Sequence, residues 1–243
     1  MGEAKVPSRT ADLLETILGV AALVGGLTAL WLAFVHAPVE ASMGLIQRTL
    51  YLHVPAAATA FLGFATVFVA SCMFLRTGRV WWDHLAAAAA ELGVLFSTVV
   101  LVSGPLWAKP IWGTYWRWEP RLTAMLILCA TYAAYLMLRH YGGRTDGCQR
   151  AAAVFGIFAF ANIPAVYFSA RLWAASQQLH PQHVQLEPRM RLALGVSTVA
   201  SALLFVCLLD IGVRLQQLAD RVAGLEESAD TAEALEGAAT DAI

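Results

Sequence analysis

Charge is scarce in this chain of 243 residues, and that scarcity narrows the class of protein. Asp, Glu, Lys and Arg make up 14% of the residues, against about 25% in soluble domains, and 59% of the residues are hydrophobic. A disordered chain and most soluble enzymes are therefore excluded. The 16 basic residues are balanced by 17 acidic ones, so the chain lacks the basic field that gathers nucleic acid. The composition instead indicates a protein whose main solvent is the lipid bilayer.

Cysteine patterns that would mark a metal or disulfide framework are also missing. The chain has four cysteines, no two of them form a CxxC pair, and no CxxCH sequence occurs. These absences exclude a disulfide framework, a zinc site and a covalently attached c-type haem. Cys72, Cys129 and Cys207 lie in apolar runs, where a thiol acts as a small buried hydrophobe.

What the chain does contain is six apolar runs long enough to cross a bilayer, which takes roughly 20 residues. Their approximate bounds are 14–35, 54–75, 85–106, 122–138, 151–170 and 192–213. They predict an all-α polytopic membrane protein, with a six-helix transmembrane domain over residues 1–213. Residues 214–243 are predicted to form a tail that begins as an amphipathic helix. Beyond Glu226, where the sequence is acidic and rich in alanine, we expect the tail to be disordered.

An even number of spans places both termini on one side of the membrane. Nine basic residues flank the spans on that side and seven on the other, and the positive-inside rule therefore predicts cytoplasmic termini. Six of the seven outer basic residues fall in two loops, 107–121 and 171–191. This concentration suggests that a negatively charged ligand binds there.

The strongest chemical signal is the segment 106–123, LWAKPIWGTYWRWEPRLT, which holds four of the eight tryptophans. An interfacial aromatic belt would distribute its aromatic residues over many helix ends, so the clustering favours a ligand platform. If the middle of the segment is helical, Trp112 and Trp116 share one face. The loop would then be amphipathic, with aromatic rings on one side and the cations Arg117 and Arg121 on the other.

Such a platform suits a large, flat, apolar ligand with acidic edges, and haem has this form. Aromatic faces stack on a conjugated ring, and arginines pair with carboxylates such as the two propionates. The iron at the centre of the ring requires axial nitrogen ligands, which histidine supplies.

Four of the six histidines, His36, His53, His180 and His183, fall on the outer side. His53 stands just before the second span, and Pro55 is placed where proline opens a helix well. A helix N-terminus disfavours imidazolium, which keeps the ring neutral, as an iron ligand must be. His180 stands in the last outer loop. His53 and His180 are therefore the candidate axial ligands, with His183 as the alternative to His180.

Three further features are predicted from local pattern. Asp83 follows Trp81 and Trp82 and is a candidate N-cap for the third span. Glu91 lies about two turns inside that span, where an ionisable group is a functional candidate by default. Asn162 and Pro164 predict a kink over a cavity in the fifth span.

Several stretches together resemble the CcmC family of cytochrome c maturation proteins. They are HVPAA at 53–57, GPLWAKPIWGTYWRWEPRLT at 104–123, and NIPAVYFSARLW at 162–173 followed by LHPQ. The family's Trp-rich, periplasmic "WWD" pattern, WG-x-x-W-x-W-x-x-R-x-T, matches from Trp112 to Thr123. This chain departs from the pattern with Tyr115 in place of Trp, Ala108 in place of Gly, and Glu119 in place of Asp.

The resemblance implies a haem-binding and haem-transfer protein of the bacterial inner membrane, not an enzyme. Haem b would be held without a covalent bond on the periplasmic face and delivered to the haem chaperone CcmE. The implied partners are the ABC-type subunits CcmA and CcmB and the small membrane subunit CcmD. The residues implied to contact haem, besides the axial histidines, are Trp107, Trp112, Gly113, Tyr115, Trp116, Arg117, Trp118, Glu119 and Arg121.

Two other functions compete with this interpretation. A b-type cytochrome, as the redox subunit of a membrane complex, would normally place its histidines well inside the spans and often in pairs on one helix. A transporter pore would require discontinuous helices in matching halves of the chain, and only Glu91 favours it. The position of the histidines at span ends and in loops favours haem transfer.

Overall fold

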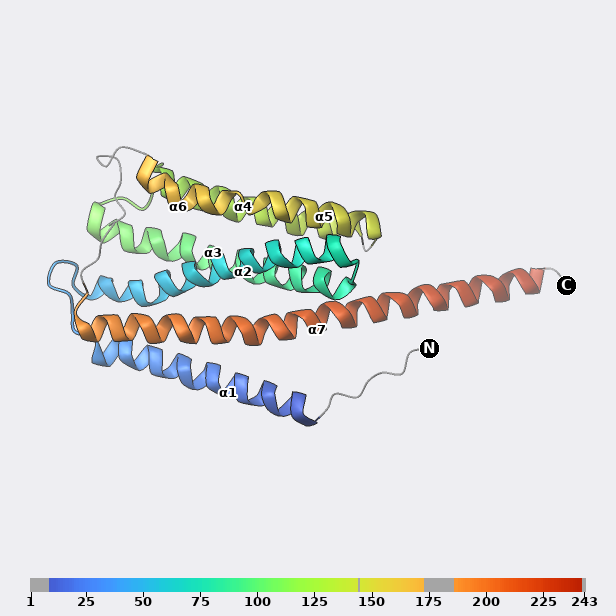
Figure 1. Ribbon diagram of the computed structural model, residues 1–243, viewed down its shortest axis with the longest axis horizontal. Coiled ribbons are helices and arrows are strands. Elements are labelled where there is room, and N and C mark those ends of the chain that lie inside the picture. The colour runs from blue at the N-terminus through green and yellow to red at the C-terminus, as the bar shows by residue number, and fades with distance from the viewer. Residues whose placement is uncertain (1–8, 144, 173–185, 242–243) are drawn as a thin grey trace.

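The computed structural model describes residues 9–143, 145–172 and 186–241, and this part of the chain is helical and contains no strand (Figure 1). Six of its segments are long and apolar enough to cross a membrane, which confirms the predicted all-α, six-span architecture. The elements in chain order are α1 (Arg9–Trp31), η1 (a π-turn, Leu32–His36), η2 (a 3-10 turn, Leu45–Thr49), α2 (Leu50–Thr77), α3 (Val80–Trp112), α4 (Pro120–Gly142), α5 (Asp146–Ala159), α6 (Asn162–Leu172) and α7 (Pro188–Asp241).

The fifth span is broken into α5 and α6, as the sequence predicts. Pro164 has no N–H to donate to the carbonyl of Phe160, so the helical ladder cannot continue through this point. The Phe160 carbonyl instead accepts the N–H of Ile163 at 3.0 Å, in a tighter turn. The break directs the start of α6 toward a cavity lined by Phe160, Ile163 and Pro164.

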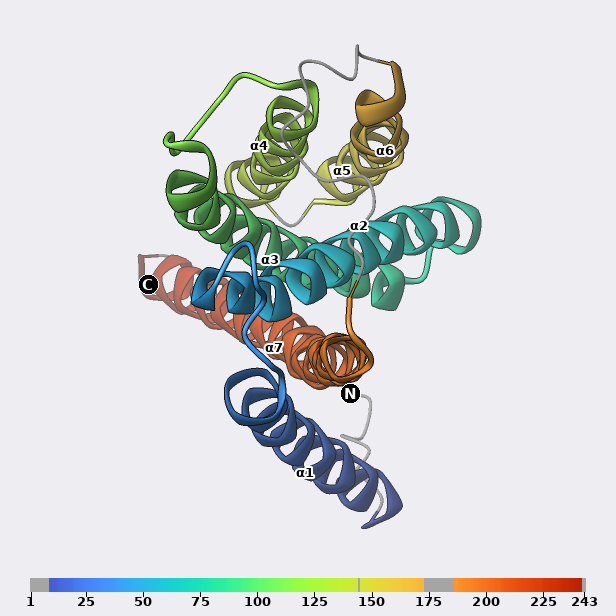
Figure 2. The ribbon, with the colours of Figure 1, turned by 90° about the vertical axis from the view of Figure 1, so that its left-hand side faces the viewer.

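α2 and α3 form an antiparallel pair at the centre of the bundle (Figures 1 and 2). A Cβ added to Gly63 would lie 3.1 Å from the Cα of Gly93, and one added to Gly93 would lie 2.5 Å from the ring of Phe64. The two glycines therefore permit the close approach of the helices. The Phe64 ring also stacks on Tyr132 of α4, with ring centroids 3.9 Å apart. This packing fixes the relative positions of α2, α3 and α4.

The other helices lie on the two sides of this pair. α4, α5 and α6 pack on one side, whereas α7 packs on the other and separates α1 from α2 and α3 (Figure 2). One end of the bundle carries the start of α2, the end of α3 and the start of α4; we call it the Trp-rich end. The turns after α2 and α4 lie at the opposite end, beyond which α7 projects (Figure 1).

The tail differs from the sequence-based expectation. α7 continues as one helix to Asp241, so the segment beyond Glu226 is helical where its composition suggested disorder. Alanine and glutamate both have high helix propensity, and together they extend the helix that the last span begins.

Candidate functional site

A cavity of about 560 Å³ opens between α2, α3, α4 and α6 at the Trp-rich end of the bundle. Its volume is within the usual range for small-molecule and cofactor sites, roughly 300–1,000 Å³. The cavity brings together three of the predicted site residues, His53 from α2, Trp116 from the segment between α3 and α4, and Arg121 from α4. Apolar side chains form most of the remaining lining, among them Ala57, Phe61, Val100, Leu101, Leu122, Met125, Val166, Tyr167 and Phe168.

His53 lies inside α2 as its fourth residue, and the prediction that it stands before the helix is wrong. The turn Leu45–Thr49 starts the helical segment earlier, so Pro55 lies within α2 and does not open it. His53 therefore lies in the first turn of α2 and lines the cavity from there.

Ser103 orients the imidazole of His53. The Nδ1 atom of His53 lies 2.9 Å from the Oγ of Ser103, and that hydroxyl donates to the carbonyl of Val99 at 2.7 Å. Because the hydroxyl proton is used on Val99, its oxygen is the acceptor for an Nδ1–H group. Nε2 is then the ring nitrogen left to ligate a metal, because a metal-binding histidine commonly donates its other ring N–H to a neighbouring acceptor. Gly104 makes room for the ring, since a Cβ there would lie 3.4 Å from its Cε1 atom.

The segment between α3 and α4 is not helical in its middle, so the condition under which Trp112 and Trp116 would share one face is not met. α3 ends at Trp112, and Gly113 follows with φ 74°, where its N–H donates to the carbonyl of Lys109 at 2.9 Å. α4 then begins with a proline, Pro120, a residue that suits the first helical position. The left-handed glycine ends one helix, so Trp112 and Trp116 do not share a helix face.

The four tryptophans instead form two edge-to-face pairs. Trp107 and Trp112 lie with ring centroids 5.0 Å apart at 78°, and Trp116 and Trp118 lie 5.6 Å apart at 80°. Trp116 is half-buried and lines the cavity, whereas Trp118 is 76% exposed. The second pair thus joins a half-buried ring to the surface of the protein, whereas Trp107 and Trp112 are both half-buried.

The indole nitrogens provide an indication of ligand chemistry. The Nε1 atoms of Trp107 and Trp116 are both buried and have no hydrogen-bond partner among the residues that the structure describes. A buried N–H without an acceptor is costly, and a carboxylate of a bound ligand could satisfy it. The half-buried cation Arg121 lines the same cavity as Trp116, so the polar groups at this point suit an anion.

The other predicted residues of the segment lie outside the lining of the cavity. Tyr115 and Arg117 are exposed, and Tyr115 packs under the Lys109 ammonium, which lies 5.1 Å from its ring. Glu119 is only 6% exposed and precedes the first residue of α4. His180 and His183 fall in the range 173–185, outside the described residues.

Glu40 closes the turn between α1 and η2 at the same end of the bundle. Its carboxylate accepts hydrogen bonds from the Ser42 hydroxyl at 2.7 Å, the Met43 N–H at 2.5 Å and the Ser42 N–H at 2.9 Å. These bonds, the Ser42 hydroxyl first among them, lower the pKa of Glu40 below its usual value. Glu40 therefore remains a carboxylate at neutral pH and keeps this turn folded.

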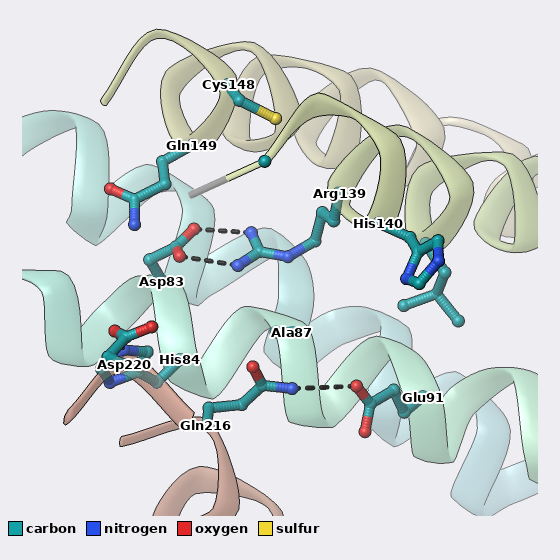
Figure 3. Close-up of a pocket in the computed structure, with 12 residues that line it drawn as sticks. Asp83, His84, Ala87, Glu91, Arg139, His140, Cys148, Gln149, Gln216 and Asp220 are labelled. Atoms are coloured by element: carbon teal, nitrogen blue, oxygen red, sulfur yellow. Dashed lines mark hydrogen bonds and ion pairs between the residues drawn. The ribbon is translucent and has the colours of Figure 1, made fainter. Parts of the chain in front are cut away.

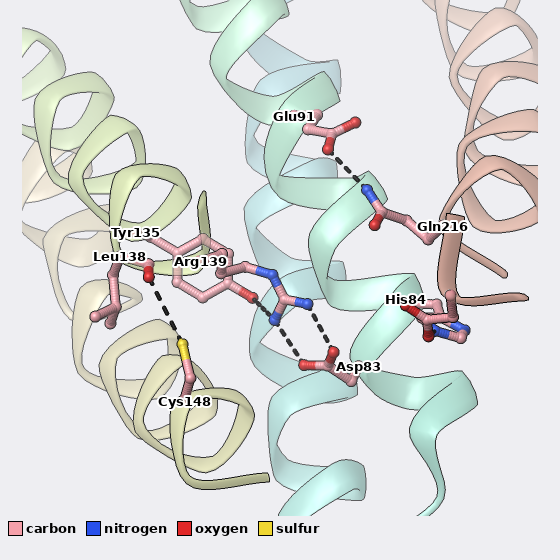
Figure 4. Close-up of polar contacts among 9 residues, drawn as sticks. Asp83, His84, Glu91, Tyr135, Leu138, Arg139, Cys148 and Gln216 are labelled. Carbon is pink, nitrogen blue, oxygen red and sulfur yellow. Dashed lines mark hydrogen bonds and ion pairs between the residues drawn. The ribbon is translucent and has the colours of Figure 1, made fainter. Parts of the chain in front are cut away.

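A second cavity, of about 480 Å³, lies at the opposite end of the bundle and is polar (Figure 3). Asp83 forms a two-point ion pair with Arg139 of α4, with both N–O distances 2.6 Å (Figure 4). The prediction of Asp83 as an N-cap is therefore wrong, because Arg79 occupies that position. Glu91 accepts a hydrogen bond from Gln216 of α7 at 2.9 Å.

His84 completes this network, with its Nε2 atom 2.5 Å from Asp220 of α7. The network joins α3 to both α4 and α7. Within it, Asp83 is paired with Arg139, and Glu91 is hydrogen-bonded to Gln216. Sequence reasoning missed these contacts because the partners are 56 to 136 positions apart. No cluster of three metal-binding side chains occurs among the described residues at either end.

The comparisons with known proteins agree with this picture. The family model described as heme exporter protein C, CcmC, matches residues 1–227. Heme exporter protein C of Escherichia coli (strain K12) is 34% identical over 171 residues, 68% of each chain. The protein of the same name from Bradyrhizobium diazoefficiens is 32% identical over 196 residues, 78% of this chain and 74% of the relative. That of Rhodobacter capsulatus is 31% identical over 201 residues, 80% of this chain and 82% of the relative.

Proposed function

Because the chain belongs to the heme exporter protein C family, we propose that its cavity at the Trp-rich end binds haem b without a covalent bond. The observation that carries the proposal is the convergence of His53, Trp116 and Arg121 on one apolar cavity from two separate parts of the sequence. The protein is a multi-pass membrane protein of a haem-handling family. Binding at this cavity would be its contribution to cytochrome c maturation.

The side chains of the cavity fit haem in three respects. The apolar walls suit the macrocycle, since a conjugated ring gains from aromatic contacts. The His53 ring, held at Nδ1 by Ser103, would offer Nε2 to the iron. The guanidinium of Arg121 and the buried Nε1–H of Trp116 suit the propionates, because charge-assisted bonds favour carboxylates.

The second axial ligand is proposed to be His180, with His183 as the alternative. Both belong to the segment that follows α6, and α6 contributes Tyr167 and Phe168 to the cavity. Haem, when bound, supplies an iron centre with two open axial positions, and the two histidines would fill them.

The residues outside the cavity lining are proposed to take part in delivery. Trp118 and Arg117 are exposed at the Trp-rich end, where a partner can reach them, and the partner we propose is the haem chaperone CcmE. Trp107, Trp112, Gly113, Tyr115 and Glu119 shape the rest of this surface. The proposed assembly also includes CcmA, CcmB and CcmD. The protein would act in the bacterial inner membrane, without an enzyme activity of its own.

The same proposal fixes the orientation in the membrane. The Trp-rich end would face the periplasm, and both termini, with the tail over residues 214–243, would be cytoplasmic. The distribution of basic residues supports this orientation, because Arg139 near the end of α4 and Arg150 near the start of α5 flank the turn opposite the Trp-rich end.

One finding favours the alternative of a b-type cytochrome subunit. His53 lies within a helix, as the haem ligands of such subunits normally do. A redox subunit would exchange electrons with a quinol through its haem, whereas a transfer protein would give up the whole haem to CcmE. Reduction of the purified protein by a quinol, measured beside transfer of haem to CcmE, separates the two functions.

The absorption spectrum of the purified, full-length protein tests the haem site directly. His53→Ala and His180→Ala should each lose haem or shift the Soret band. His140→Ala is the matched control, because this histidine lines the cavity at the opposite end and should leave the spectrum unchanged. An unchanged spectrum in His53→Ala would refute the site, and a loss confined to His183→Ala would replace His180 as the second ligand.

A further inference from the structure

A third cavity, of about 450 Å³, lies on the other side of α2 from the proposed haem site. Consecutive residues of α2 divide between the two cavities: His53 and Val54 line one, whereas Leu52 and Pro55 line the other. No histidine lines this third cavity among the described residues, so it cannot ligate iron in the manner proposed above. Its walls are mostly apolar and come from α1, α2, α3 and α7.

Small residues on α1 create the space. Ala22, Gly26 and Ala29 of α1 and Ala33 of η1 line the cavity, at spacings of three or four residues. α1 packs mainly on α7, which separates it from the central pair (Figure 2). Leu30 and Phe34 are the large side chains that line the cavity from α1 and η1, and the four small residues leave space beside them.

The depth of the cavity matches one leaflet of a bilayer. Its lining on α1 and η1 extends from Ala22 to Phe34, which at about 1.5 Å per residue is about 18 Å. The hydrocarbon core of a bilayer is about 30 Å thick, so one leaflet is about 15 Å. An acyl chain that enters from the Trp-rich end would therefore reach the bilayer midplane at the far end of the cavity.

Arg48 marks the end of the cavity where a headgroup would lie. It belongs to η2, which precedes α2, and its guanidinium lies 5.8 Å from the ring centroid of Phe34. Its Nε atom is buried and has no hydrogen-bond partner among the described residues. A buried N–H of a cation is costly without an acceptor, and arginine binds phosphate oxygens through several of its N–H groups at once.

From this combination we propose that the cavity binds an anionic phospholipid of the leaflet at the Trp-rich end. The phosphate accepts hydrogen bonds from Arg48, and one acyl chain fills the space beside α1. The lipid then supports the first turns of α2 from the side opposite to haem, where the small residues of α1 provide little packing. This site is independent of the haem proposal, because it uses different side chains and a different ligand.

Native mass spectrometry of the full-length protein tests this site, with phosphatidylglycerol and phosphatidylcholine of identical acyl chains as probes. Wild type should retain phosphatidylglycerol over phosphatidylcholine. Arg48→Gln should lower retention of phosphatidylglycerol roughly tenfold, the effect of losing one hydrogen bond to a charged group. Arg48→Lys keeps the charge and should retain an intermediate preference. Arg191→Gln removes an exposed cation outside this cavity and is the control, for which no change is expected.

A second variant tests the acyl chain separately from the phosphate. Ala29→Leu fills the cavity and should lower retention of both lipids, while circular dichroism reports whether the protein is still folded. The proposal fails if Arg48→Gln binds phosphatidylglycerol as tightly as wild type, or if wild type does not distinguish the two lipids. It also fails if the ligand released by Ala29→Leu has the mass of haem.

Discussion

The hydroxyl of Ser103 determines which nitrogen of His53 can bind iron, because it is committed as a donor to its own helix. With Val99 taking the hydroxyl proton, the oxygen accepts from Nδ1 and leaves the lone pair on Nε2. The two residues are 50 positions apart. A serine within an apolar run carries no signal that identifies such a partner, whereas His53 could be singled out from its place beside a span and from the HVPAA motif.

Ser103→Ala should therefore weaken haem binding without unfolding α3. Loss of the group that orients a metal-binding histidine typically lowers metal affinity about 10- to 100-fold, and a haem titration of the purified protein measures it. Ser97→Ala is the matched control, since Ser97 is also buried in α3 and bonds to the backbone carbonyl of Val94 at 2.9 Å. Equal haem affinity in the two variants would show that Ser103 does not position the ligand.

Arg139 tests the network at the opposite end of the bundle. Asp83 is 2% exposed, and Arg139→Ala would leave its carboxylate buried without the guanidinium. Breaking a buried pair in this way costs about 3–5 kcal/mol, which should appear as a lower free energy of unfolding in detergent. Arg150→Ala removes an exposed pair with Asp146 one helical turn away and should cost about 0.5 kcal/mol or less. Similar losses in both variants would contradict the structural role of the buried pair.

At the scale of elements, local signals predicted the helices better than they predicted the segment that joins α3 to α4. Apolar runs of the required length predicted all six membrane-spanning segments. Pro164 predicted the break between α5 and α6. The helix-like spacing of Trp112 and Trp116 was misleading, because Gly113 at φ 74° and Pro120 as a helix start both interrupt the helix. Gly113 and Pro120 can be read from the sequence as helix breakers. The spacing of the tryptophans alone does not indicate whether the helix continues or is broken at these two residues.

The division of the segment into shielded and exposed rings predicts separate effects of two similar substitutions. Trp116→Ala removes a ring from the cavity lining and should lower haem affinity at least about tenfold, since an aromatic contact and its buried area are both lost. Trp118→Ala removes a ring that is 76% exposed and should keep haem but slow its transfer to CcmE. Haem occupancy and the rate of transfer are measured on the same preparations. Full occupancy in Trp116→Ala would place haem outside this cavity.

At the scale of the whole molecule, the arrangement of the helices depends on contacts that a single sequence does not reveal. Asp83 forms an ion pair with Arg139, which is 56 positions away in the sequence, and Glu91 accepts a hydrogen bond from Gln216, which is 125 positions away. Gly63 lies against the backbone of Gly93, and Gly93 lies against the Phe64 ring, so the two glycines permit the close approach of α2 and α3. Hydropathy identifies which segments cross the membrane, but the order in which they pack follows from these pairs. The same contacts fix the helices into one bundle, which we call the frame. The proposed haem site lies at one end of this frame and the ionic network lies at the other.

This frame predicts opposite sides of the membrane for its two ends. α4 contains 23 residues, about 35 Å of helix, which is enough to cross the hydrocarbon core once. Reporter fusions at residues 113 and 146, on either side of α4, should therefore give opposite readings, external for 113 and cytoplasmic for 146. A fusion at residue 78, in the turn after α2, is the control and should agree with 146. Matching readings at 113 and 146 would mean that α4 does not span the bilayer. The tryptophans and the ionic network would then share one side, and the exposed surface around Trp118 could not be reserved for a periplasmic chaperone.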